Sequence, residues 1–150
     1  MAKVSIVTPD KRHAAPLPEG LGGNGKSEAY LSGDHDPIHA WLHRLGKGEQ
    51  LEVGPMANDC LGYIWQGEVL AGGVRLGAGS SLIAEHGECV TITGAGPGEA
   101  IVLTFRGAGA AGHNRKGGHI HLLPADRVPG AADLSGHGVG GGMHSDGQCP

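Results

Sequence analysis

Aromatic residues are scarce in this chain, which contains one phenylalanine, two tyrosines and two tryptophans among its 150 residues. A hydrophobic core must therefore rely on aliphatic side chains, and a chain of this length is enough to bury one such core as a single domain. Glycine is abundant instead, with 30 residues. Because each glycine destabilises a helix interior by about 1 kcal/mol relative to alanine, this composition disfavours long helices.

The chain also lacks an excess of positive charge and a long apolar run. It has too few cysteines for a framework of disulfide bonds. The net charge of -4 provides no basic surface for a nucleic acid. No apolar run approaches the roughly 20 residues that span a bilayer, and the first 20 residues lack the apolar core of a signal peptide. Three cysteines do not make a secreted disulfide framework. We therefore expect a cytoplasmic protein that binds neither nucleic acid nor a membrane.

The most informative stretch runs from residue 60 to residue 105 and contains short apolar segments that are separated by glycines. Residues 60–66 alternate with the period of a strand and are rich in β-favouring residues. Gly72 and Gly73 separate two such segments, which suits a tight hairpin turn with positive φ angles. Further strands are expected at residues 38–45, 50–53, 81–84, 89–93, 100–105 and 119–123. Short strands at this spacing predict a sandwich or a barrel.

Four segments of this stretch, YIWQGEV, GGVRLGAGSSLI, ECVTITG and AIVLTF, resemble a small cupin, which is a double-stranded β-helix or jelly roll. The resemblance implies an all-β, cupin-like β-barrel. We expect the barrel domain to comprise residues 30–129. Residues 1–29, rich in proline and glycine near their middle, then form an N-terminal arm. Residues 130–150 form a flexible Gly/His-rich tail, because they contain too little apolar material to fold alone.

The resemblance also indicates where a metal site would lie, and there the sequence departs from the family. Metal-binding cupins usually present two histidines one residue apart, a glutamate four or five positions later, and a third histidine in the second motif. Aligned on Gly67, the glutamate position falls near Cys60 and the paired histidines fall near residues 54–56, where no histidine is present. The later histidine position falls near Cys89. The usual set of three histidines and one glutamate is therefore absent.

Two groups of residues are candidates for an altered metal site. His119 and His121 are one residue apart on an expected strand, so both rings lie on one side, and imidazole suits iron, nickel, copper or zinc. Cys60 or Cys89 would complete the set if the histidines face the barrel interior, because thiolates also bind such metals. The alternatives are a polar sheet face for the histidines and two small core residues for the cysteines. His39 and His43 share a face as well, but nothing else in the sequence supports a metal there.

Two functions remain open at this point. The first is a cupin-fold protein without the usual metal motif, which binds a small ligand or acts as an accessory subunit of a partner. The second is a metal-dependent cupin enzyme of dioxygenase or lyase type, with an altered His/Cys ligand set and a small organic substrate, in keeping with ten histidines in the chain. We expect a homodimer in either case, since pairing removes the exposed edge of a barrel strand.

Overall fold

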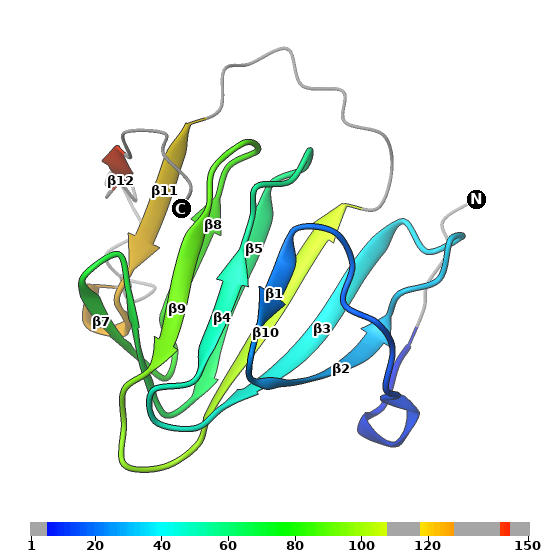
Figure 1. Ribbon diagram of the computed structural model, residues 1–150, viewed down its shortest axis with the longest axis horizontal. Helices are drawn as coiled ribbons and strands as arrows, with labels where there is room; N and C mark the ends of the chain where they lie inside the picture. Colours follow the sequence, from blue (N-terminus) through cyan, green and yellow to red (C-terminus); the bar gives the residue numbers. More distant parts are fainter. Residues whose placement is uncertain (1–5, 108–117, 128–141, 145–150) are drawn as a thin grey trace, which may run out of the picture.

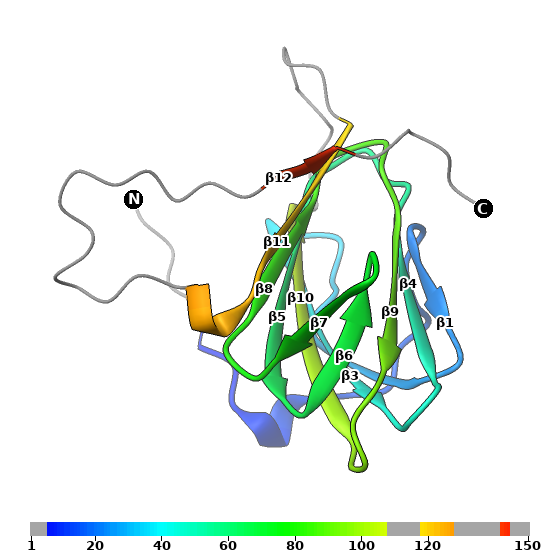
Figure 2. The same cartoon turned by 90° about the vertical axis from the view of Figure 1, so that its left-hand side faces the viewer.

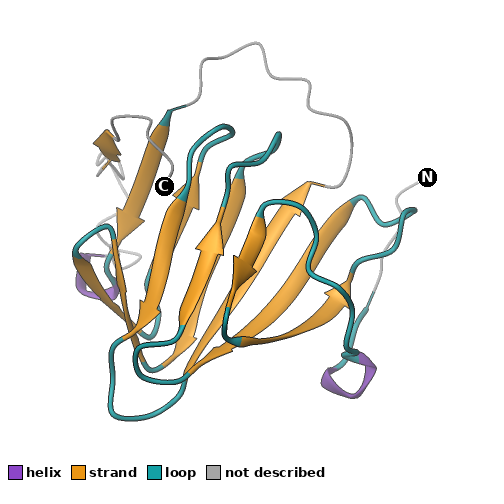
Figure 3. Ribbon diagram, in the orientation of Figure 1, coloured by secondary structure: helices purple, strands orange, loops and turns teal. Residues whose placement is uncertain are grey.

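The computed structural model describes residues 6–107, 118–127 and 142–144, and these residues confirm the all-β fold (Figure 3). The strands are β1 (Leu21–Gly23), β2 (Lys26–Leu31), β3 (Ile38–Leu45), β4 (Gln50–Val53), β5 (Cys60–Gln66), β6 (Glu68–Ala71), β7 (Val74–Gly77), β8 (Ser81–Ala84), β9 (Val90–Gly94), β10 (Ala100–Gly107), β11 (His119–Leu123) and β12 (Gly142–His144). Two short 3-10 turns, Pro9–Lys11 and Ala125–Arg127, are the helical elements of the described residues. No helix among these residues is long and apolar enough to cross a membrane.

The strands form two antiparallel sheets that face each other (Figure 2). The larger sheet has the order β12-β11-β8-β5-β10-β3-β2, and the smaller one has the order β1-β4-β9-β6-β7. Neighbouring strands that are far apart in the sequence, such as β3 and β10, are paired along their whole length. This arrangement of two packed sheets is the jelly roll that the sequence predicts.

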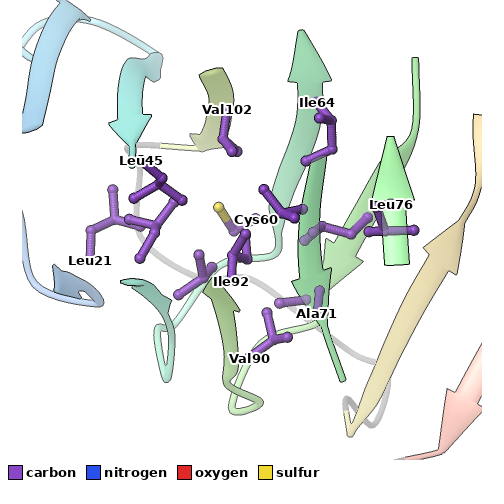
Figure 4. Packing of buried hydrophobic residues seen from close by; sticks show 14 of the residues in the cluster. Leu21, Leu45, Cys60, Ile64, Ala71, Leu76, Val90, Ile92 and Val102 are labelled. Carbon is purple, nitrogen blue, oxygen red and sulfur yellow. The ribbon is translucent and has the colours of Figure 1, made fainter. Parts of the chain in front are cut away.

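The hydrophobic core lies between the two sheets and is built from aliphatic residues, as the scarcity of aromatic residues requires. Ile64 and Val102 from the larger sheet and Leu76 and Ile92 from the smaller sheet have no exposed surface. Figure 4 shows side chains from both sheets gathered in the space between them. Trp41 of β3 is the one large aromatic residue of this core among the described residues.

The predicted strands agree closely with the observed ones. The strands expected at 38–45, 50–53, 81–84 and 119–123 have the expected bounds, and those expected at 89–93 and 100–105 are displaced or extended by one or two residues. Gly72 and Gly73, with φ angles of 55° and 77°, form the two-residue turn between β6 and β7. Both φ angles are positive, as the hairpin prediction required.

The structure describes strands in both of the segments that were predicted to form the N-terminal arm and the C-terminal tail. Strands β1 and β2 begin within residues 1–29, the segment expected to be an arm, and pair with β4 and β3 respectively. Apart from β12, the segment expected to be a flexible tail, residues 130–150, lies outside the described residues.

Several connections and the end of β10 lie together at one end of the barrel. The connections 32–37, 54–59 and 85–89 and the last residues of β10 lie at the upper end of the sheets in Figure 1. We call this the loop end of the barrel. Gly54 shows how closely the chain is packed there, because a Cβ atom on this residue would lie 2.0 Å from the carbonyl oxygen of Glu88.

Candidate functional site

A row of five side chains crosses the inner face of the larger sheet at the loop end. The strand register pairs His39 with Arg106, Arg106 with Cys60, Cys60 with Ala84, and Ala84 with Ile120. Residues that pair directly across strands lie on the same face of a sheet. Since Cys60, Ala84 and Ile120 belong to the hydrophobic core, the whole row faces the interior. The row therefore contributes two polar side chains, His39 and Arg106, to the loop end of the barrel.

Arg106 is half-buried and has no carboxylate within ion-pair distance among the described residues, whereas Arg12, Arg44 and Arg75 each contact a glutamate. Its Nη1 atom donates a hydrogen bond to the backbone carbonyl of Glu19, at 2.8 Å. Its side chain lines a pocket of about 230 Å³ together with residues 19, 56–58 and 107. The guanidinium group of Arg106 is thus a cation beside a small pocket.

Three buried side-chain polar atoms have no hydrogen-bond partner within the part of the chain that is described, and all three lie close together in the strand register. They are Nε of Arg106, Nδ1 of His39 and Nε1 of Trp41. His39 is directly opposite Arg106, and Trp41 is two residues along β3, opposite Thr104. A buried polar group is normally hydrogen-bonded, so an unsatisfied group calls for a ligand, an ion or a water molecule. Their concentration at one place makes this corner of the loop end the leading candidate site.

His43 lies deeper on the same face of β3, and both of its ring nitrogens have a hydrogen-bond partner. Its Nδ1 atom is 2.7 Å from Ser27 Oγ, and its Nε2 atom is 2.8 Å from Thr104 Oγ1. The ring is fully buried, and this burial lowers the pKa of His43 from 6.5 to about 4. His43 is therefore a neutral hydrogen-bonding residue of the core at neutral pH.

His119 and His121 are brought together by the structure, with ring centroids 6.0 Å apart. They lie on the outer face of the larger sheet, because Ile120 between them points into the core. The carboxylate of Glu85 joins the two rings. His119 Nδ1 donates to Glu85 Oε1 at 2.9 Å, and His121 Nε2 is 3.4 Å from Glu85 Oε2. Glu85 is 8% exposed, so this cluster has a buried acid and two half-exposed imidazoles.

The two cysteines of the predicted metal set are in different states, and Cys60 lies on the opposite face of the sheet from the histidines. Cys60 is a free, fully buried thiol on the inner face, across the sheet from the histidine cluster. Burial raises the pKa of Cys60 to about 11, although the charge of Arg106 and a backbone hydrogen bond from Phe105 oppose this effect. Cys89 takes part in a disulfide bond. Disulfides are unusual in a reducing compartment, and the predicted cytoplasmic location is untested.

A metal of the kind that cupins bind is not well matched by these residues. Within the described ranges, no group of three or more histidine, cysteine, aspartate or glutamate side chains is arranged to hold a metal ion. The inner row has one histidine, one arginine and otherwise small or apolar residues. A metal at His119 and His121, with or without Cys60 and Cys89, stays a prediction that elemental analysis can test.

Sequence reasoning did not identify Arg106 or Glu85, and each was missed for a different reason. Arg106 lies near the end of the apolar strand β10 and pairs with strands that are distant in the sequence, so only the register reveals its neighbours. Glu85 lies in the loop between β8 and β9, which the strand pattern of the sequence does not place. In β11, however, the alternation of His119 and His121 with Ile120 and Leu122 already contained the information that the apolar residues face inwards.

Comparison with known proteins connects this fold to solved structures. No family model and no curated protein matches the sequence. A predicted oxalate decarboxylase from Thermotoga maritima superposes with a TM-score of 0.56 and 18% identity, over 69% of this chain and 98% of the other. An RmlC-like cupin from Shewanella frigidimarina gives a TM-score of 0.53 and 16% identity, over 71% and 93% of the two chains.

A third structure is a conserved protein with a double-stranded β-helix domain from Klebsiella pneumoniae, which gives a TM-score of 0.53 and 18% identity over 81% of this chain and 98% of the other. At such low identity these similarities establish the fold and nothing of the activity. This chain has the cupin fold, the double-stranded β-helix.

Proposed function

We propose that this protein binds a small organic ligand at the loop end of its barrel and holds it with its own side chains rather than through a metal. The observation that carries this proposal is the composition of the inner row. Where a metal-binding cupin needs several imidazoles and a carboxylate, the row has Cys60, Ala84 and Ile120. Beside them lie the unsatisfied polar atoms of His39, Trp41 and Arg106.

The chemistry of these groups supports binding more strongly than catalysis. Arg106 supplies a permanent positive charge, and the indole of Trp41 can only donate a hydrogen bond. The thiol of Cys60 is protonated at neutral pH, since its pKa is about 11, so it is a poor nucleophile. A positive charge and hydrogen-bond donors are enough to bind a ligand, so these groups suit a ligand-binding protein or an accessory subunit.

Elemental analysis of protein purified without a histidine tag tests this proposal. We expect every transition metal to be far below one atom per chain. Near-stoichiometric iron, nickel, copper or zinc would contradict it.

A metal-dependent enzyme of dioxygenase or lyase type is the second candidate, and the contact of Glu85 with both His119 and His121 favours it. Two imidazoles and a carboxylate are donors that divalent metals accept. As they stand, however, these donors bond to one another. If they bind a metal, the double substitution His119→Ala/His121→Ala removes it and leaves the β-type circular dichroism unchanged. The double substitution His13→Ala/His35→Ala, at two exposed histidines, is the matched control.

A further inference from the structure

The orientation of the Arg106 guanidinium indicates which kind of ligand the loop end accepts. Nη1 is already used, because it donates to the carbonyl oxygen of Glu19 at 2.8 Å. The opposite edge of the group, formed by Nε and Nη2, remains, and Nε is buried without a partner. Two parallel N–H groups on one edge of a guanidinium match the two oxygens of a carboxylate.

The surroundings of Arg106 favour an anion for an independent reason. A half-buried cation without a counter-ion has lost part of its hydration and has gained no ion pair in return. Glu19, the acidic residue that lines the same pocket, is exposed to solvent and contributes its backbone carbonyl rather than its carboxylate to Arg106. A bound anion would therefore supply the charge that the described residues do not place there.

The size of the pocket limits the ligand. Its volume of about 230 Å³ is below the range of roughly 300–1,000 Å³ that is usual for drug-sized ligands. Asn58, whose Nδ2 atom donates to the carbonyl of Gly107, fixes one wall of the pocket.

From these observations we infer that the ligand is a small carboxylic acid whose carboxylate is bound by the Nε–Nη2 edge of Arg106 at the loop end. This inference rests on the proposed ligand-binding function and specifies the chemical class of the ligand. Arg106 acts as the anchoring residue.

Nuclear magnetic resonance of the full-length, ¹⁵N-labelled protein tests the inference without any substitution. Malonate serves as the probe, and malonamide is its uncharged counterpart. Titration with malonate should shift the Arg106 Nε–H resonance in a saturable manner, and malonamide should leave it in place. An unmoved Arg106 resonance, an equal response to malonamide, or equally tight binding of inorganic phosphate overturns the carboxylate assignment.

Substitutions add a second readout. Arg106→Gln should weaken malonate binding at least about tenfold, because a charge-assisted hydrogen-bond pair is lost. Arg75→Gln removes an exposed arginine that pairs with Glu68 and should leave the affinity unchanged. Equal affinities in the two variants would overturn the role of Arg106. If Arg106→Gln does not fold, the resonance of the unsubstituted protein still decides the matter. Stoichiometric metal would contradict the proposed function and not this inference, so the two failures are distinguishable.

Discussion

His43 is a buried residue whose titration affects the stability of the barrel. It is buried between Ser27 and Thr104, and its pKa falls from 6.5 in an unfolded chain to about 4 in the fold. Between these two pH values the unfolded state binds more protons, so the free energy of unfolding must rise with pH. Its contribution is complete above pH 6.5 and is lost as the pH falls towards 4.

Denaturant unfolding at a series of pH values tests this dependence. We expect the free energy of unfolding to fall by about 1.4 kcal/mol per pH unit below pH 6, and by about 3 kcal/mol in total at pH 4. The variant His43→Gln keeps hydrogen-bonding groups but cannot titrate, so its profile should be flatter. The variant His35→Gln, at an exposed position, should retain the original profile. A steep profile in His43→Gln would show that another group is responsible.

Cys60 provides a second prediction at the scale of the residue. Its thiol is fully buried and its pKa is about 11, so the reactive thiolate is both rare and inaccessible in the folded protein. Iodoacetamide at pH 8 should therefore leave Cys60 unmodified until denaturant is added, as followed by mass spectrometry of the peptide that contains it. Rapid modification of the native protein would mean that the inner row is open to solvent.

At the scale of the element, the loop end depends on close contacts between connections. Gly54 has a φ angle of 88°, and an added Cβ atom would overlap the backbone of Glu88. Gly48 has a similar φ angle of 82° but open space around it. Both substitutions to alanine pay backbone strain of about 1–3 kcal/mol, and only Gly54→Ala adds a clash with a backbone atom.

Comparison of the two alanine variants separates strain from steric overlap. Gly54→Ala should unfold at a clearly lower denaturant concentration than Gly48→Ala, and its loss of stability should exceed that of Gly48→Ala by at least about 1 kcal/mol. Equal stabilities would show that the connections at the loop end can separate without loss.

The sequence predicts where the strands lie better than which face of each strand is inside. In β10 the apolar side chains Ile101, Leu103 and Phe105 share a face, yet this is the outer face, and Phe105 is 37% exposed. The inner face of the same strand has Val102 and Thr104, which are buried. Because both faces of β10 are apolar, alternation alone could not distinguish them. The candidate site depends on this choice of face and on long-range register, and so it could not be found from the sequence.

At the scale of the whole molecule, the outer face of the larger sheet is unusually apolar. In the strand register, Ile83 of β8 is paired with Leu61 of β5, and Leu61 is paired with Phe105 of β10. These three side chains are 38%, 41% and 37% exposed, respectively. Ile38 and Trp65, also exposed, lie on the same sheet. Contiguous exposed apolar patches usually mark an interface.

A second copy of this chain is the partner that we expect on this face, whereas the homodimer predicted from the sequence would pair exposed strand edges. These exposed apolar residues lie on four adjacent strands, β8, β5, β10 and β3. Four strands spaced by about 4.8 Å, with about seven residues of about 3.3 Å each, give a face of about 440 Å² in projection, compared with the roughly 800 Å² of accessible surface that each partner buries in a standard interface. A two-fold pairing of such faces would bury the same row of side chains on both copies.

Light scattering on two matched variants tests the dimer. Leu61→Lys places a charge in the row and should yield a monomer. Leu70→Lys alters a leucine of similar exposure, 39%, on the smaller sheet and should remain dimeric. A monomeric unsubstituted protein, or a dimer that survives Leu61→Lys, would exclude this interface.

Native mass spectrometry of the untagged protein tests the central claim, binding of a small organic ligand without a metal, most directly. The folded protein should have the mass of its polypeptide, alone or with an organic ligand that dissociates on denaturation, and no added mass of a metal ion. Treatment with a chelator should leave this spectrum and the binding of malonate unchanged. A metal ion in most of the folded molecules, or loss of malonate binding after chelation, would contradict the account.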